Sequence, residues 1–274
     1  MVGEVVVGIL AHSLALLSDA AHMLTDAGAI GLSLVALALA ARPAAGAMTY
    51  GLKRAEILSA QANGVTLLVL AGLIVYEAIH RLVEPPQVRG WAVLIVALVG
   101  VGVNLLASWQ LAKANRDNMA IEGSFQHIVT DLYAFIGTVI AAVIILTTGF
   151  MRADAIASVF VAALMLRASY GLLKDSGRVL LEASPEGMNP REIGRALATF
   201  PEVKNVHDLH VWQIASGFPA LSAHVLVSPG ADCHTIRREL AELIHDRFGI
   251  DHTTLQVDHE TANKLIDLPR GTRA

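Results

Sequence analysis

The sequence is poor in charge, because only 16% of its 274 residues are Asp, Glu, Lys or Arg, whereas 54% are hydrophobic. Soluble globular domains carry about 25% charged residues. This deficit, together with a mean hydropathy of +0.56, predicts a membrane protein. Cysteine is nearly absent too: a single Cys233 excludes a disulfide within the chain and gives no sign of an oxidising compartment.

Two signatures of other protein classes are also missing. There is no basic run for a nucleic-acid partner, and no Walker-type glycine loop for a nucleotide. Basic and acidic residues balance at 11 each over residues 1–181, whereas residues 182–274 hold 9 basic and 13 acidic residues and seven of the 11 histidines. An apolar body therefore precedes an acidic, histidine-rich, soluble part.

Five apolar segments are long enough to cross a bilayer as helices, for which about 20 residues suffice. Residues 1–11 are apolar but too few, so we expect a partial first helix whose beginning the sequence lacks; a re-entrant or interfacial segment is the alternative. Polar or Pro- and Gly-containing stretches separate the segments. The predicted spans are 14–41, 55–79, 91–112, 125–148 and 153–173.

The cations predict an orientation. Counting six spans, seven Lys and Arg residues lie in loop 42–54, in loop 113–118 and at the end of the last span, against three in the loops of the opposite side. The positive-inside rule therefore places these loops and the C-terminal part in the cytoplasm. We expect a multi-pass protein of the inner (cytoplasmic) membrane.

One pentapeptide pattern occurs twice inside the apolar segments, as HMLTD from His22 to Asp26 and as HIVTD from His127 to Asp131. In a helix, residues i and i+4 share a face, so two such helices would offer two nitrogens and two oxygens to one ion. That set suits tetrahedral zinc. Asp19, one turn before the first histidine, is a candidate outer partner of the ligands. A hydrogen-bonded packing network or a metal-free proton relay is the alternative.

The C-terminal part alternates helix and strand signals. Asn189 and Pro190 predict a helix start, and strands are expected near 205–214, 220–228 and 253–260, with a second helix over 232–248. The fold class expected is a membrane all-α bundle of five to six transmembrane helices over 1–181, followed by a small α+β (α-β-β-α-β) cytosolic domain over 182–260 and a flexible tail over 261–274.

Several long segments resemble the cation diffusion facilitator family of bacterial zinc exporters, among them SLALLSDAAHMLTDAGAIGLSLVA, HIVTDLYAFIGTVIAAVII and VHDLHVW. The resemblance implies six helices before a ferredoxin-like cytosolic domain, a homodimer, and a divalent metal exchanged for protons. It places the transport site at His22, Asp26, His127 and Asp131. It also implies that the first helix begins upstream of Met1.

The resemblance further suggests regulatory metal ligands in the cytosolic domain at His207, His224, His234 and Asp258. Regular alternation along a strand would put residues 207 and 210 on opposite faces. The loop RPAAGAMTYGLKR contains neither Asp nor His, so we expect no additional metal site there. The family's charge interlock corresponds to Lys53 and Arg54 with Glu182; an ordinary solvated ion pair is the alternative.

These observations predict an exporter of divalent cations, zinc first and cadmium or cobalt next, that works as a metal/proton antiporter by alternating access. Zinc would be the transported substrate and a candidate regulatory ligand. The expected partners are the metal ion, protons, the lipid bilayer and a second copy of the chain. The alternatives are a transport-inactive metal sensor or fragment and a membrane metalloenzyme, although a site saturated by four ligands disfavours an enzyme.

Overall fold

The computed structural model describes residues 2–112 and 119–260, and the side chains of residues 2–110 and 128–260. The chain forms two compact units. One comprises Met1–Ala38 and Leu58–Asp175, and the other comprises Leu39–Ile57 and Ser176–Ala274. The loop that follows the second helix therefore belongs to the same unit as the C-terminal domain.

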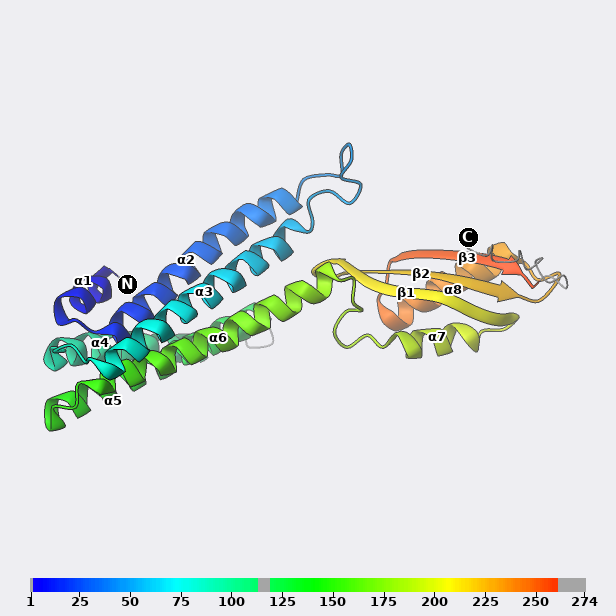
Figure 1. Cartoon of the computed structure of the whole chain (residues 1–274). Coiled ribbons are helices and arrows are strands. Elements are labelled where there is room, and N and C mark those ends of the chain that lie inside the picture. The colour runs from blue at the N-terminus through cyan, green and yellow to red at the C-terminus, as the bar shows by residue number, and fades with distance from the viewer. Residues whose placement is uncertain (1, 113–118, 261–274) are drawn as a thin grey trace, which may run out of the picture. The chain divides into compact units, whose positions relative to one another are not determined.

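Within the described residues, six helices precede the C-terminal domain, and five of them are long and apolar enough to cross a membrane; Figure 1 shows their arrangement. Large apolar side chains such as Leu34, Tyr76 and Trp91 are 63%, 73% and 68% exposed; these surfaces suit contact with lipid chains. The helices are α1 Val2–Ala11, α2 Leu14–Ala40, α3 Ala55–Val83, α4 Gly90–Ala112, α5 Met119–Thr148 and α6 Arg152–Leu180.

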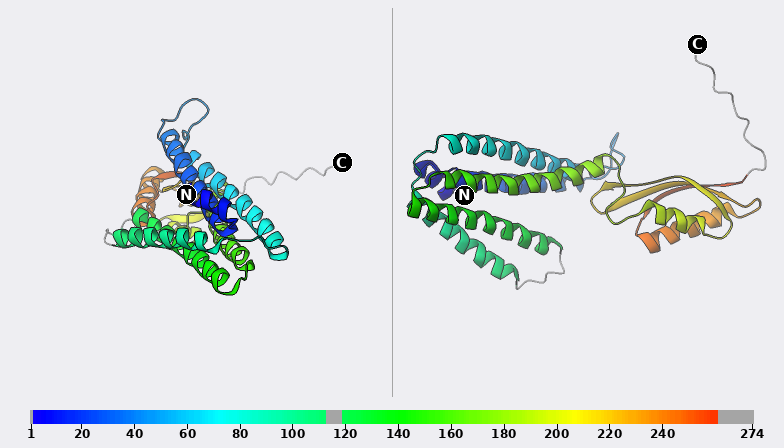
Figure 2. Two further views of the ribbon diagram at one scale, coloured as in Figure 1. Left: turned by 90° about the vertical axis from the view of Figure 1, so that its left-hand side faces the viewer. Right: turned by 60° about the horizontal axis from the view of Figure 1, so that its bottom comes forward.

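Glycines allow the closest helix contacts in the first unit. A Cβ on Gly100 of α4 would lie 2.3 Å from the ring of Phe135 on α5, so only glycine fits there. Gly64 of α3 similarly faces Leu173 of α6, and Ser169 donates a hydrogen bond of 2.8 Å to the Gly64 carbonyl. Figure 2 shows α4 and α5 as a hairpin whose members stay together along their length.

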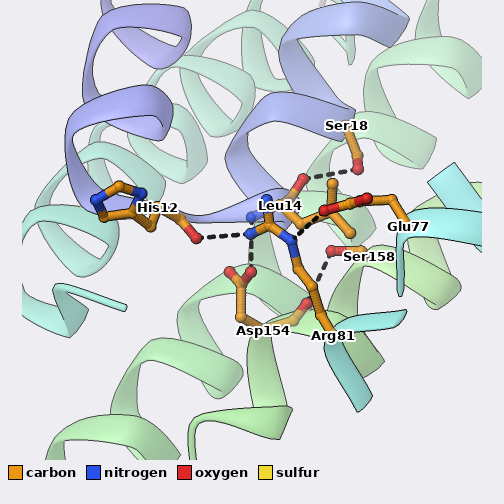
Figure 3. Close-up of polar contacts among 7 residues, drawn as sticks. All are labelled: His12, Leu14, Ser18, Glu77, Arg81, Asp154 and Ser158. Carbon is orange, nitrogen blue, oxygen red and sulfur yellow. Dashed lines mark hydrogen bonds and ion pairs between the residues drawn. The ribbon is translucent and has the colours of Figure 1, made fainter. Parts of the chain in front are cut away.

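A buried polar cluster ties the start of α2 to α6 and α3 (Figure 3). The carboxylate of Asp154, 2% exposed, accepts hydrogen bonds from the Ser13 hydroxyl at 2.5 Å and from the Leu14 N–H at 2.6 Å. Helix starts leave N–H groups without intrahelical partners and favour nearby negative charge. Asp154 therefore caps α2 from another helix. Next to it, Arg81 of α3 donates to the carbonyl of His12 at 2.7 Å.

The C-terminal domain has the order α7, β1, β2, α8, β3, and its three-stranded sheet has the spatial order β1-β2-β3. Strands β1 and β2 are antiparallel, whereas β2 and β3 are parallel. Both helices lie on one face of the sheet (Figure 1), which leaves the opposite face open. The predicted fold class is confirmed. The bounds are α7 Pro190–Ala198, β1 Val203–Ala215, β2 Phe218–Val227, α8 Cys233–Phe248 and β3 His252–His259.

Local capping explains where the two helices of this domain begin. Asn189 caps α7 by accepting a hydrogen bond from the Arg191 N–H at 3.0 Å, with Pro190 as the first helical residue. Asp232 caps α8 and accepts from the Thr235 hydroxyl and N–H, and these hydrogen bonds lower the pKa of the Asp232 carboxyl. The lowered pKa favours the ionised carboxylate of Asp232, which is the form that accepts these hydrogen bonds.

Asp154→Ala should lower the free energy of unfolding by about 3 kcal/mol, because it leaves two buried donors at the start of α2 without an acceptor. Thermal unfolding of the purified protein in detergent, followed by tryptophan fluorescence, measures the loss. Asp175→Ala, at an exposed position of the same helix, is the matched control and should change little. Equal melting temperatures for the two variants would contradict the capping role.

Candidate metal sites

The repeated pentapeptide brings an imidazole between two carboxylates in the membrane unit. The Nδ1 of His22 lies 3.7 Å from the Asp26 carboxylate on the same helix, and its Nε2 lies 3.8 Å from the carboxylate of Asp131 on α5. The three side chains are 8%, 22% and 17% exposed. Two helices far apart in the sequence thus direct nitrogen and oxygen donors at one place.

These separations suit a bound zinc ion. Zinc–ligand bonds of about 2.0–2.1 Å give a spacing of about 3.3 Å between neighbouring ligands of a tetrahedron, close to the 3.8 Å between Nε2 of His22 and the Asp131 carboxylate. A metal-bound histidine commonly donates its second N–H to a carboxylate, so an ion on Nε2 and Asp131 leaves Nδ1 of His22 directed at Asp26. His127 lies in α5 one turn before Asp131; its side chain is outside the described residues.

The surroundings of His22 become more open along α2. Asp19, one turn toward the start of the helix, is only 2% exposed, and its Oδ2 accepts no hydrogen bond from the residues that the structure describes. Asp26, one turn beyond His22, has a side chain that is 22% exposed. The hydroxyl of Thr25 donates a hydrogen bond of 2.6 Å to the backbone carbonyl of His22 and so does not face the possible metal ligands.

The open face of the cytosolic sheet carries a second group of donors. His207 of β1 lies opposite His224 of β2, with ring centroids 5.3 Å apart. With Asp208 they form an exposed group in which one ligand atom from each lies within 4.8 Å of the others. Asp208 has a φ of 50°, uncommon for a residue with a side chain, and it was not among the residues that the sequence suggested.

An irregularity in β1 explains this group and corrects the expectation of regular alternation. Between His207 and His210 the register shifts, so that these residues pair with His224 and Ser222. Because the two partners are only two residues apart on β2, they share a face, and so do the two histidines. The expectation that His207 and His210 point to opposite faces is therefore wrong.

The other suggested cytosolic ligands lie elsewhere in the domain. His234 is in the first turn of α8, next to the cap residue. Asp258 of β3 accepts a hydrogen bond of 2.7 Å from Gln256, which pairs with His224 in the parallel register. Neither His234 nor Asp258 belongs to the donor group found among the described residues. The resemblance predicts that both are metal ligands, whereas the geometry favours a site made of His207, Asp208 and His224; zinc titration of variants distinguishes the two predictions.

The loop between α2 and α3 contacts the cytosolic domain within their shared unit. Arg54 pairs with Glu182 at 3.3 Å, and its Nε donates to the Ile214 carbonyl at 3.4 Å. Lys53 does not join the pair, since its ammonium lies 4.2 Å from the ring centre of Phe218. The geometry brings together Arg54 and Glu182 of the suggested interlock and gives Lys53 an aromatic partner instead.

A further contact of this loop region could not be found from the sequence. The carboxylate of Glu56 accepts a hydrogen bond of 2.7 Å from the backbone N–H of Ser216, in the turn between β1 and β2. A backbone donor carries no sequence signal, and only the fold brings the turn to Glu56. Three charged residues near the start of α3, Lys53, Arg54 and Glu56, thus have partners on the cytosolic domain.

Comparison with known proteins covers nearly the whole chain. Residues 1–181 match the family model described as the cation efflux transmembrane domain, and residues 185–260 match the cytoplasmic domain of cation efflux proteins. The chain is 38% identical over 267 residues to a cadmium, cobalt and zinc/H(+)-K(+) antiporter of Bacillus subtilis, which covers 96% of this chain and 86% of that protein.

Two other similar proteins are the zinc transporter ZitB of Escherichia coli and the CzcD transporter of Cupriavidus metallidurans. ZitB is 37% identical over 95% of this chain and 83% of its own length, and the CzcD efflux protein is 36% identical over 94% and 82%. A solved metal-bound C-terminal domain of a CzcD transporter is 31% identical, covers 26% of this chain and 97% of that structure, and has a TM-score of 0.25.

Asp208→Ala or His224→Ala should weaken zinc binding to the cytosolic domain by about tenfold or more, because each removes a donor of the group. His234→Ala should leave it unchanged. Isothermal titration would be done on full-length protein whose membrane site is inactivated by Asp26→Ala and Asp131→Ala. A loss with His234→Ala as large as with Asp208→Ala would contradict the grouping.

Proposed function

Because the chain belongs to the cation efflux family, the cation diffusion facilitators that its sequence resembles, we propose that it exports zinc from the cytoplasm in exchange for protons. The observation that supports this proposal most directly is His22 between the carboxylates of Asp26 and Asp131 on two membrane helices. The family assignment makes the chain a metal cation efflux transporter and not an enzyme. The proposal adds that the exported ion is zinc and that it is exchanged for protons.

The donor chemistry favours zinc among the divalent ions. Imidazole and carboxylate donors suit zinc in four-coordination, whereas magnesium and calcium prefer six or more oxygen ligands. Cadmium and cobalt accept similar donors, and both appear with zinc in the name of the Bacillus subtilis relative. We therefore propose zinc as the main substrate and these two ions as additional ones.

Exchange for protons follows from the chemistry of the ligands. Imidazole nitrogens and carboxylates must be deprotonated before they bind a metal, so protons and zinc compete for the same atoms. The increase in exposure from Asp19 to Asp26 supports loading of the metal from the end of α2 that the cations assign to the cytoplasm. Movement of the helices would then open the site to the opposite side, where protons displace the ion.

The cytosolic domain suits two further roles. The match to the cytoplasmic domain of cation efflux proteins supports a homodimer, and the group of His207, Asp208 and His224 offers a regulatory zinc site on the open face of the sheet. We propose that zinc bound on this face strengthens the contacts between the cytosolic domain and the loop between α2 and α3. Arg54 and Glu56 make such contacts with Glu182 and with the Ser216 N–H. The inner membrane is the proposed location.

Asp26→Ala and Asp131→Ala should each abolish zinc uptake by inside-out vesicles and lower the membrane site's zinc affinity by more than about 100-fold. Loss of a residue that merely orients a ligand already costs 10–100-fold. Flux is followed with a zinc-sensitive dye and affinity by isothermal titration. Asp175→Asn, an exposed position in α6, serves as the control. Wild-type flux in either aspartate variant would refute this site.

Glu182→Lys should lower zinc transport strongly but barely change stability. The two side chains of the pair are 40% and 64% exposed, and exposed ion pairs contribute about 0.2–1 kcal/mol. The reversal instead places two cations together where the loop meets the domain. Arg54→Glu combined with Glu182→Lys restores opposite charges and should recover transport. If the double variant transports no better than the single one, the pair is an ordinary solvated contact.

A further inference from the structure

The helix bundle is closed at the end where α2 begins. In Figure 1 and Figure 2 the long helices of the membrane unit meet where α2 and α6 begin and spread apart toward their other ends. Exposure along α2 follows the same course, because Ser18 and His22 are buried whereas the side chain of Asp26, one turn beyond, is 22% exposed. The metal donors are therefore shielded from the end that the cations assign to the non-cytoplasmic side.

Polar contacts from α3 and α6 close this end around the turn between α1 and α2 (Figure 3). Asp154 of α6 accepts hydrogen bonds from Ser13 and Leu14, and Arg81 of α3 donates to the carbonyl of His12. We call these five residues the outer cluster. His12 has a φ of 57°, which is uncommon for a residue with a side chain. Surrounding contacts are needed to keep a turn in such a conformation.

A separate set of contacts joins α3 to α6. Near the same end of the bundle, the Nε of Arg152 on α6 donates to the carbonyl of Leu82 on α3 at 2.7 Å. Further along the two helices, Ser169 of α6 donates to the carbonyl of Gly64 on α3 at 2.8 Å. These contacts do not involve α2, so α2 can leave α3 and α6 while they stay together. The hydrogen bonds that this movement would break are those of the outer cluster.

We propose that the outer cluster keeps the non-cytoplasmic end closed while the metal site loads from the cytoplasm, and that its hydrogen bonds break when the ion is released. This inference rests on the proposed export function, because alternating access requires each end to be sealed while the other is open. A hydrogen bond of a charged side chain shifts an equilibrium by about tenfold or more. A few such bonds hold the end closed and still allow it to open.

The test measures opening of this end by the reaction of a cysteine with a membrane-impermeant thiol reagent. The reporter is Ser18→Cys in full-length protein that also carries Cys233→Ser, which removes the natural thiol. Ser18 lies one turn before His22 on the same face of α2 and is 1% exposed. In right-side-out vesicles the reagent reaches the non-cytoplasmic side. Arg81→Gln should raise the labelling rate about tenfold, because it removes a charged hydrogen bond from the closed state.

Arg152→Gln is the matched control. It removes the same kind of side chain and a hydrogen bond of the same length to a backbone carbonyl, but that bond joins α6 to α3. It should label at the wild-type rate. An unchanged rate in Arg81→Gln would overturn the proposal, and so would an equal rise in Arg152→Gln. In inside-out vesicles, where the reagent reaches the cytoplasmic side, Arg81→Gln should not raise labelling; a rise from both sides would mean general loosening and would also overturn it.

Ser13→Ala gives a second test on a different helix, in case Arg81→Gln does not fold. It removes the hydroxyl that donates to Asp154 at 2.5 Å and should also raise labelling from the non-cytoplasmic side, whereas an unchanged rate would count against the outer cluster. Labelling rates do not depend on zinc flux. Absence of zinc flux in the wild type would therefore refute the export function, while the labelling rates decide separately whether the outer cluster closes this end.

Discussion

The structure depends on the cost of placing charge among apolar helices. An aspartate at bilayer depth costs about 2.5–3.5 kcal/mol on insertion scales, and His22, Asp26 and Asp131 offset part of this cost only when α2 and α5 lie side by side. A metal ion shared by these side chains would offset more. The helix arrangement and the proposed substrate are therefore consequences of the same electrostatic requirement.

Contacts outside the site hold α2 and α5 in place. Asp154 of α6 fixes the first turn of α2 from 140 residues away, and Arg81 fixes the carbonyl just before it. The contact of Gly100 with Phe135 joins α5 to α4. These contacts gather at the end of the bundle where α2 starts and in its interior. The other end of α2, at Ala40, leads into the loop held by the cytosolic domain.

The repeated pattern predicted that His22 and Asp26 share a helix face, because a spacing of i and i+4 fixes that face whatever surrounds it, and the structure brings both close to Asp131. That these side chains bind a metal stays a prediction. The fold class followed from long apolar segments and from alternating signals after residue 182, and it is confirmed. Two residues could not be predicted. Asp208 joins its group through an irregularity in β1, and Glu56 binds a backbone donor.

The loop between α2 and α3 contacts the cytosolic domain and is continuous with two membrane helices. The His252 ring packs in T-shaped contacts against both Tyr50 of this loop and Phe218 at the start of β2. The same β2 carries His224 of the proposed regulatory group, six residues further on. A zinc ion that joins β1 to β2 would stiffen the strand that also contacts the loop. If zinc on the sheet shifts the conformation of the loop by some factor, then by linkage the loop's conformation alters zinc affinity on the sheet by the same factor.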